Sequence, residues 1–192
     1  EFGLTDEQRA KVAVDQRTNA LAHPHAVFRN TPITTEDVLN SPMICSPLHM
    51  LEIVMPCMGG AAVVVTSKEK AAKTKNRPVH VVGGGENTTH RSVTYEPDFT
   101  HSPIKAASDR AWAMSGLKPK DIDLASLYDC YTITVLLTLE DTGFCGKGEA
   151  GSFVEDGRLR LGGALPTNTD GGGLSACHPG QRGLFLIVEA TR

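Results

Sequence analysis

The sequence predicts an α/β protein in which buried strands alternate with helices. Apolar residues recur at helical spacing in several segments of the 192-residue chain, and continuous β-branched runs lie between them. Glycine and proline separate these segments. A hydrophobic share of 40% is ordinary globular composition and argues against a disordered chain. Strands that alternate with helices in this way are typical of the α/β class.

Capping signals mark the first two helices. Thr5 and Gln8 have the spacing of a capping box, in which the hydroxyl accepts an early helix N–H and the amide reaches back. The helix that follows is predicted to stop at His23, because the residue before a proline disfavours helical geometry. A second, short helix is predicted to begin at Thr35.

A buried strand and a domain boundary are predicted next. Residues 59–66 form a continuous small and β-branched run, as in a strand that is covered on both faces. Ser67 is positioned to cap a lysine-rich helix that extends to about Lys75. The polar, proline-bearing stretch 76–78 then divides the chain into residues 1–75 and 76–192, and a new strand is expected at 79–82.

The second unit continues the alternation. Pro103 is expected to open a helix that ends at Gly116, and residues 122–128 are expected to form a strand. The stretch 129–142 is apolar nearly all round, so we expect a buried helix closed by Gly143. A glycine-rich connection over 143–173 follows, and Pro179 is expected to open the last helix.

Composition argues against several classes of protein. With 19 basic and 22 acidic side chains, the net charge of −3 argues against a nucleic-acid surface. No apolar stretch approaches the roughly 18 residues that a membrane span requires, and the first residues lack the features of a signal peptide. The five scattered cysteines predict neither a disulfide framework nor a zinc site. We therefore expect a cytoplasmic protein without a bound metal.

Both ends of the sequence lead us to expect a longer protein. Glu1 directly precedes a helix cap with no strand before it. Arg192 ends an apolar helical pattern that has no C-capping signal.

His178 is the first candidate for chemistry. It follows a glycine-rich stretch that includes Gly172 and Gly173, and it precedes a proline at the expected start of a helix. Glycines allow a ligand to approach the backbone closely, and a helix N-terminus disfavours the protonated imidazole, which would leave His178 available as a base. A histidine that only caps the helix is the alternative interpretation.

The second candidate is the Tyr128-Asp129-Cys130-Tyr131 stretch at a predicted strand-to-helix turn. The carboxyl ends of strands are where α/β proteins place their sites. The Tyr128 hydroxyl could donate to a developing oxyanion, and Asp129 could orient it or simply cap the helix. The alternative is that Tyr128 and Tyr131 serve only in packing.

Two further features are weaker. The glycines at 83–85 follow a predicted strand but lack the lysine of a phosphate-binding loop, so a turn is the better interpretation. Cys177 is next to His178, but sequence neighbours rarely point at each other, which argues against a nucleophile at Cys177.

Taken together, these motifs resemble the thiolase superfamily, in particular its sterol-carrier-protein-thiolase or lipid-transfer-protein branch. The resemblance covers essentially the whole chain and is strongest over 124–192, where YDCY, TGFCGKGE, the Pro-x-Asn-Thr-x-Gly-Gly stretch and His-Pro follow in order. It implies an α-β-α-β-α layered fold of two similar halves, assembled as a homodimer. Residues 1–75 would be the end of the N-terminal half, and 76–192 an incomplete C-terminal half.

The resemblance also implies roles for individual residues. His178 would match the histidine that activates the acyl-accepting cysteine and contributes to an oxyanion hole, and Tyr128 would face the same oxyanion, with Asp129 beside it. The side of the site that binds substrate and coenzyme A would include Cys177, Gly172, Gly173 and Tyr131. The acyl-accepting cysteine would lie upstream of this sequence and a further acid–base cysteine downstream, because none of the five cysteines matches either motif.

Three departures from the family pattern bear on the activity. Cys177 stands where the family has a glycine, and Met58 stands where it has an aspartate. Tyr128 replaces a water-holding asparagine or histidine. A phenol can donate to an oxyanion and also shuttle a proton, which suits the branch members that resemble retro-aldolases acting on steroid side chains.

The expected function is therefore an acyl-CoA-dependent making or breaking of a carbon–carbon bond in lipid or sterol metabolism. Thiolase-like acyl transfer is slightly favoured by His178, retro-aldol cleavage of a β-hydroxyacyl-CoA is nearly equal, and a non-catalytic acyl-CoA-binding subunit is the third possibility. Coenzyme A would be a substrate, with no resident cofactor. A small OB-fold acyl-CoA-binding protein is a possible partner by resemblance, and the 192-residue chain alone is expected to lack thiolase activity.

Overall fold

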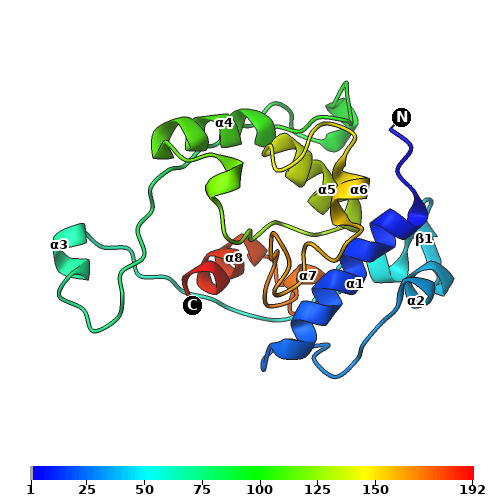
Figure 1. The fold of residues 1–192 in the computed structure, drawn as a ribbon, viewed down its shortest axis with the longest axis horizontal. Coiled ribbons are helices and arrows are strands. Elements are labelled where there is room, and N and C mark those ends of the chain that lie inside the picture. The colour runs from blue at the N-terminus through cyan, green and yellow to red at the C-terminus, as the bar shows by residue number, and fades with distance from the viewer. Residues whose placement is uncertain (1) are drawn as a thin grey trace.

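The computed structural model describes residues 2–192 and is rich in helix (Figure 1). The α-helices are α1 (Asp6–Ala22), α2 (Thr35–Asn40), α3 (Lys68–Ala71), α4 (Ile104–Ser115), α5 (Thr132–Asp141), α6 (Ala150–Val154), α7 (Gly172–Ser175) and α8 (Arg182–Thr191). Strands β1 (Met43–Cys45) and β2 (Leu48–His49) pair as an antiparallel hairpin. Short 3-10 helices span Met50–Glu52, Val93–Tyr95 and Pro119–Asp121.

Helix α1 is the element against which several other helices pack. It contacts α2, α5, α6 and α7, and it crosses the front of the body in Figure 1. The main apolar core forms where α1 meets α5 and α6. Its fully buried members are Val12, Val135, Leu139, Ala150, Val154 and Leu159.

The buried face of α1 is also polar, and these polar groups fix the loops that follow α6. Asn19 is fully buried, and its Nδ2 donates to the carbonyls of Leu159 and Thr167 at 3.1 and 2.9 Å. Arg17 Nε donates to Ser175 Oγ at 2.8 Å. Because buried polar groups need partners, these bonds determine how the loops lie on α1.

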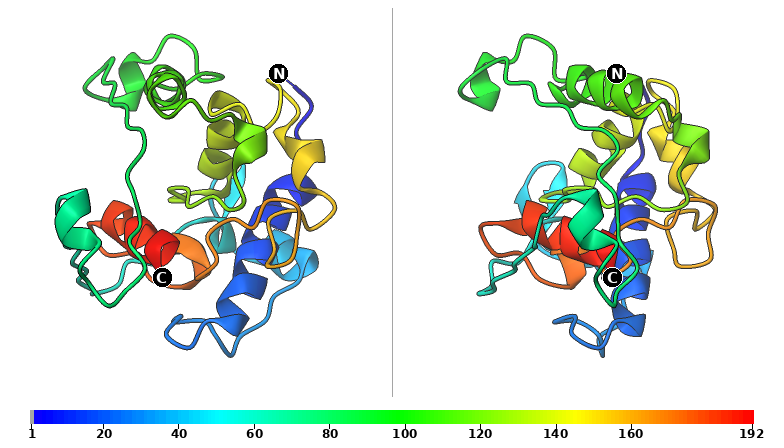
Figure 2. Two further views of the ribbon diagram at one scale, coloured as in Figure 1. Left: turned by 60° about the vertical axis from the view of Figure 1, so that its left-hand side comes forward. Right: turned by 90° about the vertical axis from the view of Figure 1, so that its left-hand side faces the viewer.

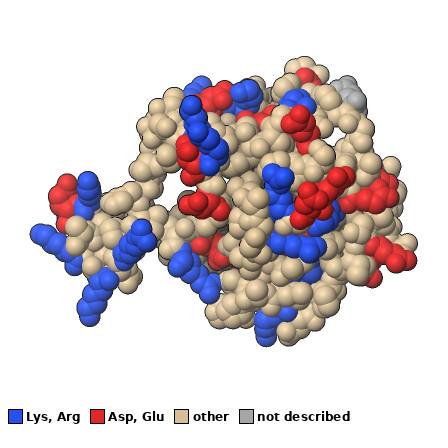
Figure 3. Space-filling view, in the orientation of Figure 1, with Lys and Arg blue, Asp and Glu red and all other residues tan. Residues whose placement is uncertain are grey.

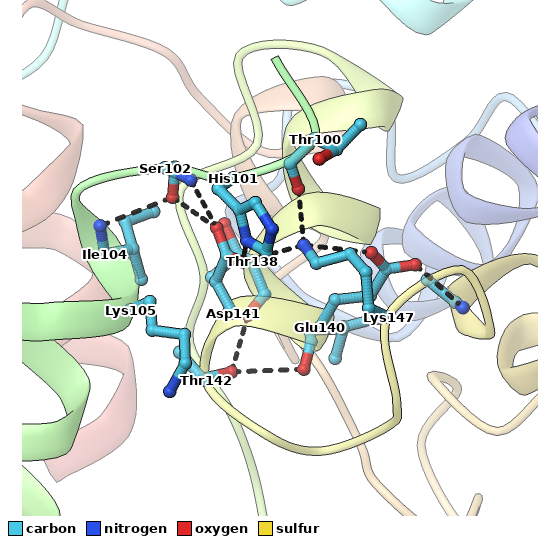
Figure 4. Close-up of polar contacts among 12 residues, drawn as sticks. Thr100, His101, Ser102, Ile104, Lys105, Thr138, Glu140, Asp141, Thr142 and Lys147 are labelled. Atoms are coloured by element: carbon cyan, nitrogen blue, oxygen red, sulfur yellow. Dashed lines mark hydrogen bonds and ion pairs between the residues drawn. The ribbon is translucent and has the colours of Figure 1, made fainter. Parts of the chain in front are cut away.

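A buried carboxylate joins α4 to α5. Asp141 accepts hydrogen bonds from the backbone N–H and hydroxyl of Ser102 at 2.8 and 2.6 Å, and from Lys147 Nζ at 2.8 Å (Figure 4). The indole N–H of Trp112 donates to the carbonyl of Thr142 at 3.0 Å. The residue Ser102 just before α4 and the last turn of α4 are therefore both attached to the end of α5.

The local capping predictions are confirmed. Thr5 and Gln8 form the reciprocal capping box of α1, and α1 ends before His23. Helix α2 begins at Thr35 as predicted. Gly116 closes α4 in the left-handed conformation at φ 71°, and Gly143 follows α5 at φ 84°.

None of the three predicted strands forms a regular strand, so these predictions are wrong. Residues 59–66 and 79–82 belong to no strand and are largely exposed, with Val64, Val65 and Val81 at 94, 84 and 89%. Residues 122–128 make only one isolated bridge, between Ala125 and Thr167. A strand needs a neighbour to satisfy its backbone groups, and the described residues place none beside 59–66 or 79–82.

Several predicted boundaries also shift. Ser67 caps α3 as expected, but α3 ends at Ala71, well before Lys75. Helix α8 begins at Arg182 rather than at Pro179. The connection over 143–173 contains α6 and the start of α7. Figure 1 shows α3 on a loop that projects from the body, and lysine and arginine side chains gather on that projection in Figure 3.

Candidate active site

Tyr128 and His178 meet in space although they are 50 residues apart in the sequence. The Tyr128 hydroxyl lies 3.2 Å from His178 Nε2, and the two rings are 5.7 Å apart at an angle of 36°. Tyr128 is 45% exposed, so its hydroxyl is accessible from solvent. His178 lies in an extended segment that forms a parallel bridge with Pro56, not at the start of a helix. The sequence-predicted pair therefore forms one site.

Asp129 has a role that the local pattern did not reveal. Its side chain is fully buried, and its two oxygens accept the backbone N–H groups of Gly173 and Leu174 at 2.8 and 3.0 Å. It therefore does not cap α5, whose N-cap is Tyr131. Instead it attaches the turn that carries Tyr128 to the start of α7, just before the segment that carries His178.

Gly172 and Gly173 make this attachment possible. A Cβ on Gly172 would lie 2.2 Å from Asp129 Oδ2, and Gly172 adopts φ 70°, which other residues rarely tolerate. A Cβ on Gly173 would lie 2.8 Å from both Asp129 Oδ1 and His178 Cδ2. These glycines were predicted to let a ligand approach; within the described residues, the group that approaches them is the carboxylate of Asp129.

Burial shifts the pKa values of Tyr128, His178 and Asp129. Desolvation raises the pKa of the Tyr128 phenol and lowers the pKa of His178, which the Arg182 charge lowers further. At neutral pH the phenol therefore keeps its proton, and His178 is neutral. Burial raises the pKa of Asp129 to about 6, although the two backbone N–H bonds and Arg182 favour its charged form.

The low pKa of His178 thus has a different cause from the one the sequence predicted. A helix N-terminus was expected to disfavour the charged imidazole, but α8 begins only at Arg182. Arg182 itself is buried and its NH2 group contacts both oxygens of Asp170 at 2.8 Å. Sequence reasoning missed this ion pair, because nothing in the local pattern links the two residues.

The remaining predicted residues are Cys177 and Tyr131, which are close to the pair in the sequence. Cys177 precedes His178 and its Sγ lies 2.9 Å from Cys57 Sγ, a contact that the sequence did not indicate. Tyr131 is 41% exposed and forms an isolated bridge with Ile53. Within residues 2–192, no cluster of three or more His, Cys, Asp or Glu side chains is arranged to hold a metal, and no helix is both long and apolar enough to cross a bilayer.

The geometry supports acid–base chemistry. A protonated phenol and a neutral imidazole at hydrogen-bonding distance supply one donor and one acceptor for the same substrate atom or for neighbouring atoms. Donors aimed at an oxygen stabilise the negative charge that develops there during reaction.

Comparisons with known proteins match this chain to one family. Residues 85–192 match the family described as Thiolase C-terminal domain-like. The chain is 39% identical to the steroid side-chain-cleaving aldolase of Thermomonospora curvata, covering 100% of this chain and 50% of that protein. It is also 39% identical to the 17-hydroxy-3-oxo-4-pregnene-20-carboxyl-CoA lyase of Mycobacterium tuberculosis (99% and 50%), and 36% identical to an acetyl-CoA acetyltransferase of Methanothermobacter thermautotrophicus (100% and 50%).

A solved structure agrees with these relatives. An Ltp2-ChsH2(DUF35) aldolase superimposes with a TM-score of 0.93 at 38% identity, covering all of this chain and 51% of that one. The thiolase-like resemblance inferred from the motifs is therefore confirmed. The chain spans about half the length of the relatives it matches.

Replacing Gly172 tests whether the Asp129 contact organises the site. Gly172→Ala should lower the free energy of unfolding by about 2 kcal/mol or more. The alanine would be strained in the left-handed conformation, and its Cβ would displace the carboxylate of Asp129. Gly183→Ala is the matched control, because a Cβ there meets nothing within 4 Å. The control lies within α8 and should be neutral or stabilising by up to about 1 kcal/mol. Equal urea midpoints for the two variants in the complete protein would contradict the assignment.

Proposed function

Because the chain belongs to the thiolase C-terminal domain-like family, we propose that the protein containing it cleaves a carbon–carbon bond beside a coenzyme A thioester by retro-aldol chemistry. The substrate class is a β-hydroxyacyl-CoA, with a steroid side chain as the acyl group. The observation that carries the proposal is the contact between the Tyr128 hydroxyl and His178 Nε2. Coenzyme A enters as part of the substrate.

His178 and Tyr128 divide the proton chemistry. Neutral His178 accepts the proton of the β-hydroxyl group as the bond between Cα and Cβ breaks. The electrons of that bond move onto the thioester as an enolate, whose oxygen accepts a hydrogen bond from the Tyr128 phenol. A carbonyl compound leaves, and protonation of the enolate at Cα gives the shortened acyl-CoA. Asp129 is a positioning residue, because its buried carboxylate bonds only backbone N–H groups.

Two observations favour the retro-aldol reaction over thiolysis. The phenol of Tyr128 supplies an oxyanion donor without any acyl-enzyme. Identity to the proteins named as aldolase and lyase is 39%, compared with 36% for the acetyl-CoA acetyltransferase. His178 favours the second candidate, thiolase-like acyl transfer, which requires a nucleophilic cysteine from outside these residues. An acyl-CoA-binding subunit without activity is the outcome if neither reaction is detected.

The assembly is also proposed. The similar solved structure is named as an aldolase with a DUF35 protein, so we propose a partner of this kind, with the small OB-fold acyl-CoA-binding protein as the expected type. We also propose a homodimer, from the family resemblance, and a cytoplasmic location, from the five scattered cysteines.

Tyr128→Phe removes the proposed oxyanion donor while keeping the ring. In the complete protein, kcat for β-hydroxyacyl-CoA cleavage should fall by about 10²–10³-fold. Tyr95→Phe is the control, because Tyr95 is highly exposed and outside the site, and its kcat should not change. Release of the carbonyl product gives the rate. Unchanged turnover in Tyr128→Phe would remove the phenol from the mechanism.

The rate should fall on the acid side of neutrality. At pH 7 Asp129 is mainly ionised and accepts both backbone N–H groups, and His178, whose pKa lies below its ordinary value, is neutral. As the pH falls through about 6, protonation turns one Asp129 oxygen into a donor that faces an N–H group. Protonation of His178 in acid removes its capacity as a base. Initial rates from pH 5 to 8 measure this decline. A flat profile over that range would contradict both assignments.

A further inference from the structure

Cys57 and Cys177 lie side by side although they are 120 positions apart in the sequence, and Cys177 directly precedes His178 in the chain. Pro56 and His178 form a parallel bridge, and Cys57 N donates to the carbonyl of His178 at 3.3 Å. The two Sγ atoms are 2.9 Å apart. Both thiols are free and only partly buried, so a small reagent has access to them.

The two sulfurs have different surroundings. Burial, followed by the hydrogen bond with Cys57, raises the pKa of the Cys177 thiol to about 11. Cys177 therefore keeps its proton at neutral pH, and either sulfur can donate in the contact between the two thiols. The backbone N–H of His178 donates to Cys57 Sγ at 2.9 Å. Cys57 Sγ thus has a backbone donor, whereas Cys177 Sγ donates to the carbonyl of Met58 at 3.8 Å.

We propose that Cys57 and Cys177 form a dithiol site that a small disulfide oxidises to a reversible Cys57–Cys177 bond. Cys57 sulfur attacks the reagent and forms a mixed disulfide, releasing one small thiol. Cys177 sulfur then attacks Cys57 sulfur, breaks the mixed disulfide and releases the second small thiol. The protein loses two protons and two electrons, and the reagent gains them. A reducing thiol reverses both steps.

The bond joins the segment at residues 56–58 to the segment that carries His178. Those two segments are otherwise held by the bridge at Pro56 and the weak contacts of the two sulfurs. The dithiol site is separate from the proposed acid–base function, because it involves the two thiols alone and can be detected without turnover.

The test uses oxidised glutathione on the complete protein, followed by alkylation of free thiols and tryptic digestion without reductant. The expected product joins the peptide of residues 30–68, which holds Cys57, to the peptide of residues 161–182, which holds Cys177. Mass spectrometry should detect it as two hydrogen atoms lighter than the two reduced peptides, and dithiothreitol should separate it. Fragment ions must place the bond at Cys57, because Cys45 lies on the same peptide.

Variants make the assignment specific. Cys45→Ser and Cys130→Ser should retain the cross-link, whereas Cys57→Ser and Cys177→Ser should lose it. If Cys57→Ser does not fold, the fragment ions of the wild-type peptide and the Cys45→Ser variant decide the question. Glutathione adducts on single cysteines without the cross-link would overturn the proposal, as would fragment ions that place the bond at Cys45.

Discussion

The site depends on the buried carboxylate of Asp129. Its two oxygens accept the N–H groups of Gly173 and Leu174, and these bonds hold two chain segments together. One segment continues from Tyr128 into α5, and the other continues from α7 to His178. A buried carboxylate that lost these donors would leave three polar groups unsatisfied at once, at a cost of about 1–3 kcal/mol each. The hydrogen bonds of Asp129 therefore hold the phenol near the imidazole, although neither ring takes part in those bonds.

Helix α1 provides the fixed surface on which this network is built. Asn19 bonds the loop that precedes α7, Arg17 bonds Ser175 at the end of α7, and the apolar residues of α1 pack against α5. Both segments that meet at Asp129 thus rest on the same helix. These bonds explain the buried positions of Asn19 and Arg17, because each side chain also bonds backbone carbonyls that an apolar side chain could not bond.

Local sequence signals predicted the helix caps of this fold, but they did not predict contacts between residues far apart in the sequence. The caps at Thr5 and Gly116 are encoded within a few residues, and both predictions were right. The valine run at 59–66 was predicted as a buried strand from its composition alone, but a strand also requires a partner, which its own sequence does not specify. Tyr128 and His178 were predicted as site residues from motifs, and their roles stay predictions. Their contact in space, the bonds of Asp129 and the Cys57–Cys177 contact depend on tertiary structure. The glycines at 172 and 173 were the available signal, and they were interpreted as space for a ligand.

We propose that Tyr128 and His178 act as an acid–base pair without a covalent acyl-enzyme. The most direct measurement is the intact mass of the complete protein after incubation with a short-chain acyl-CoA, alongside product analysis with a β-hydroxyacyl-CoA. We expect no acyl adduct in the first experiment, and a carbonyl product with a shortened acyl-CoA in the second. An adduct of one acyl group that disappears on adding coenzyme A, without β-hydroxyacyl-CoA cleavage, would contradict the claim and identify the protein as a thiolase.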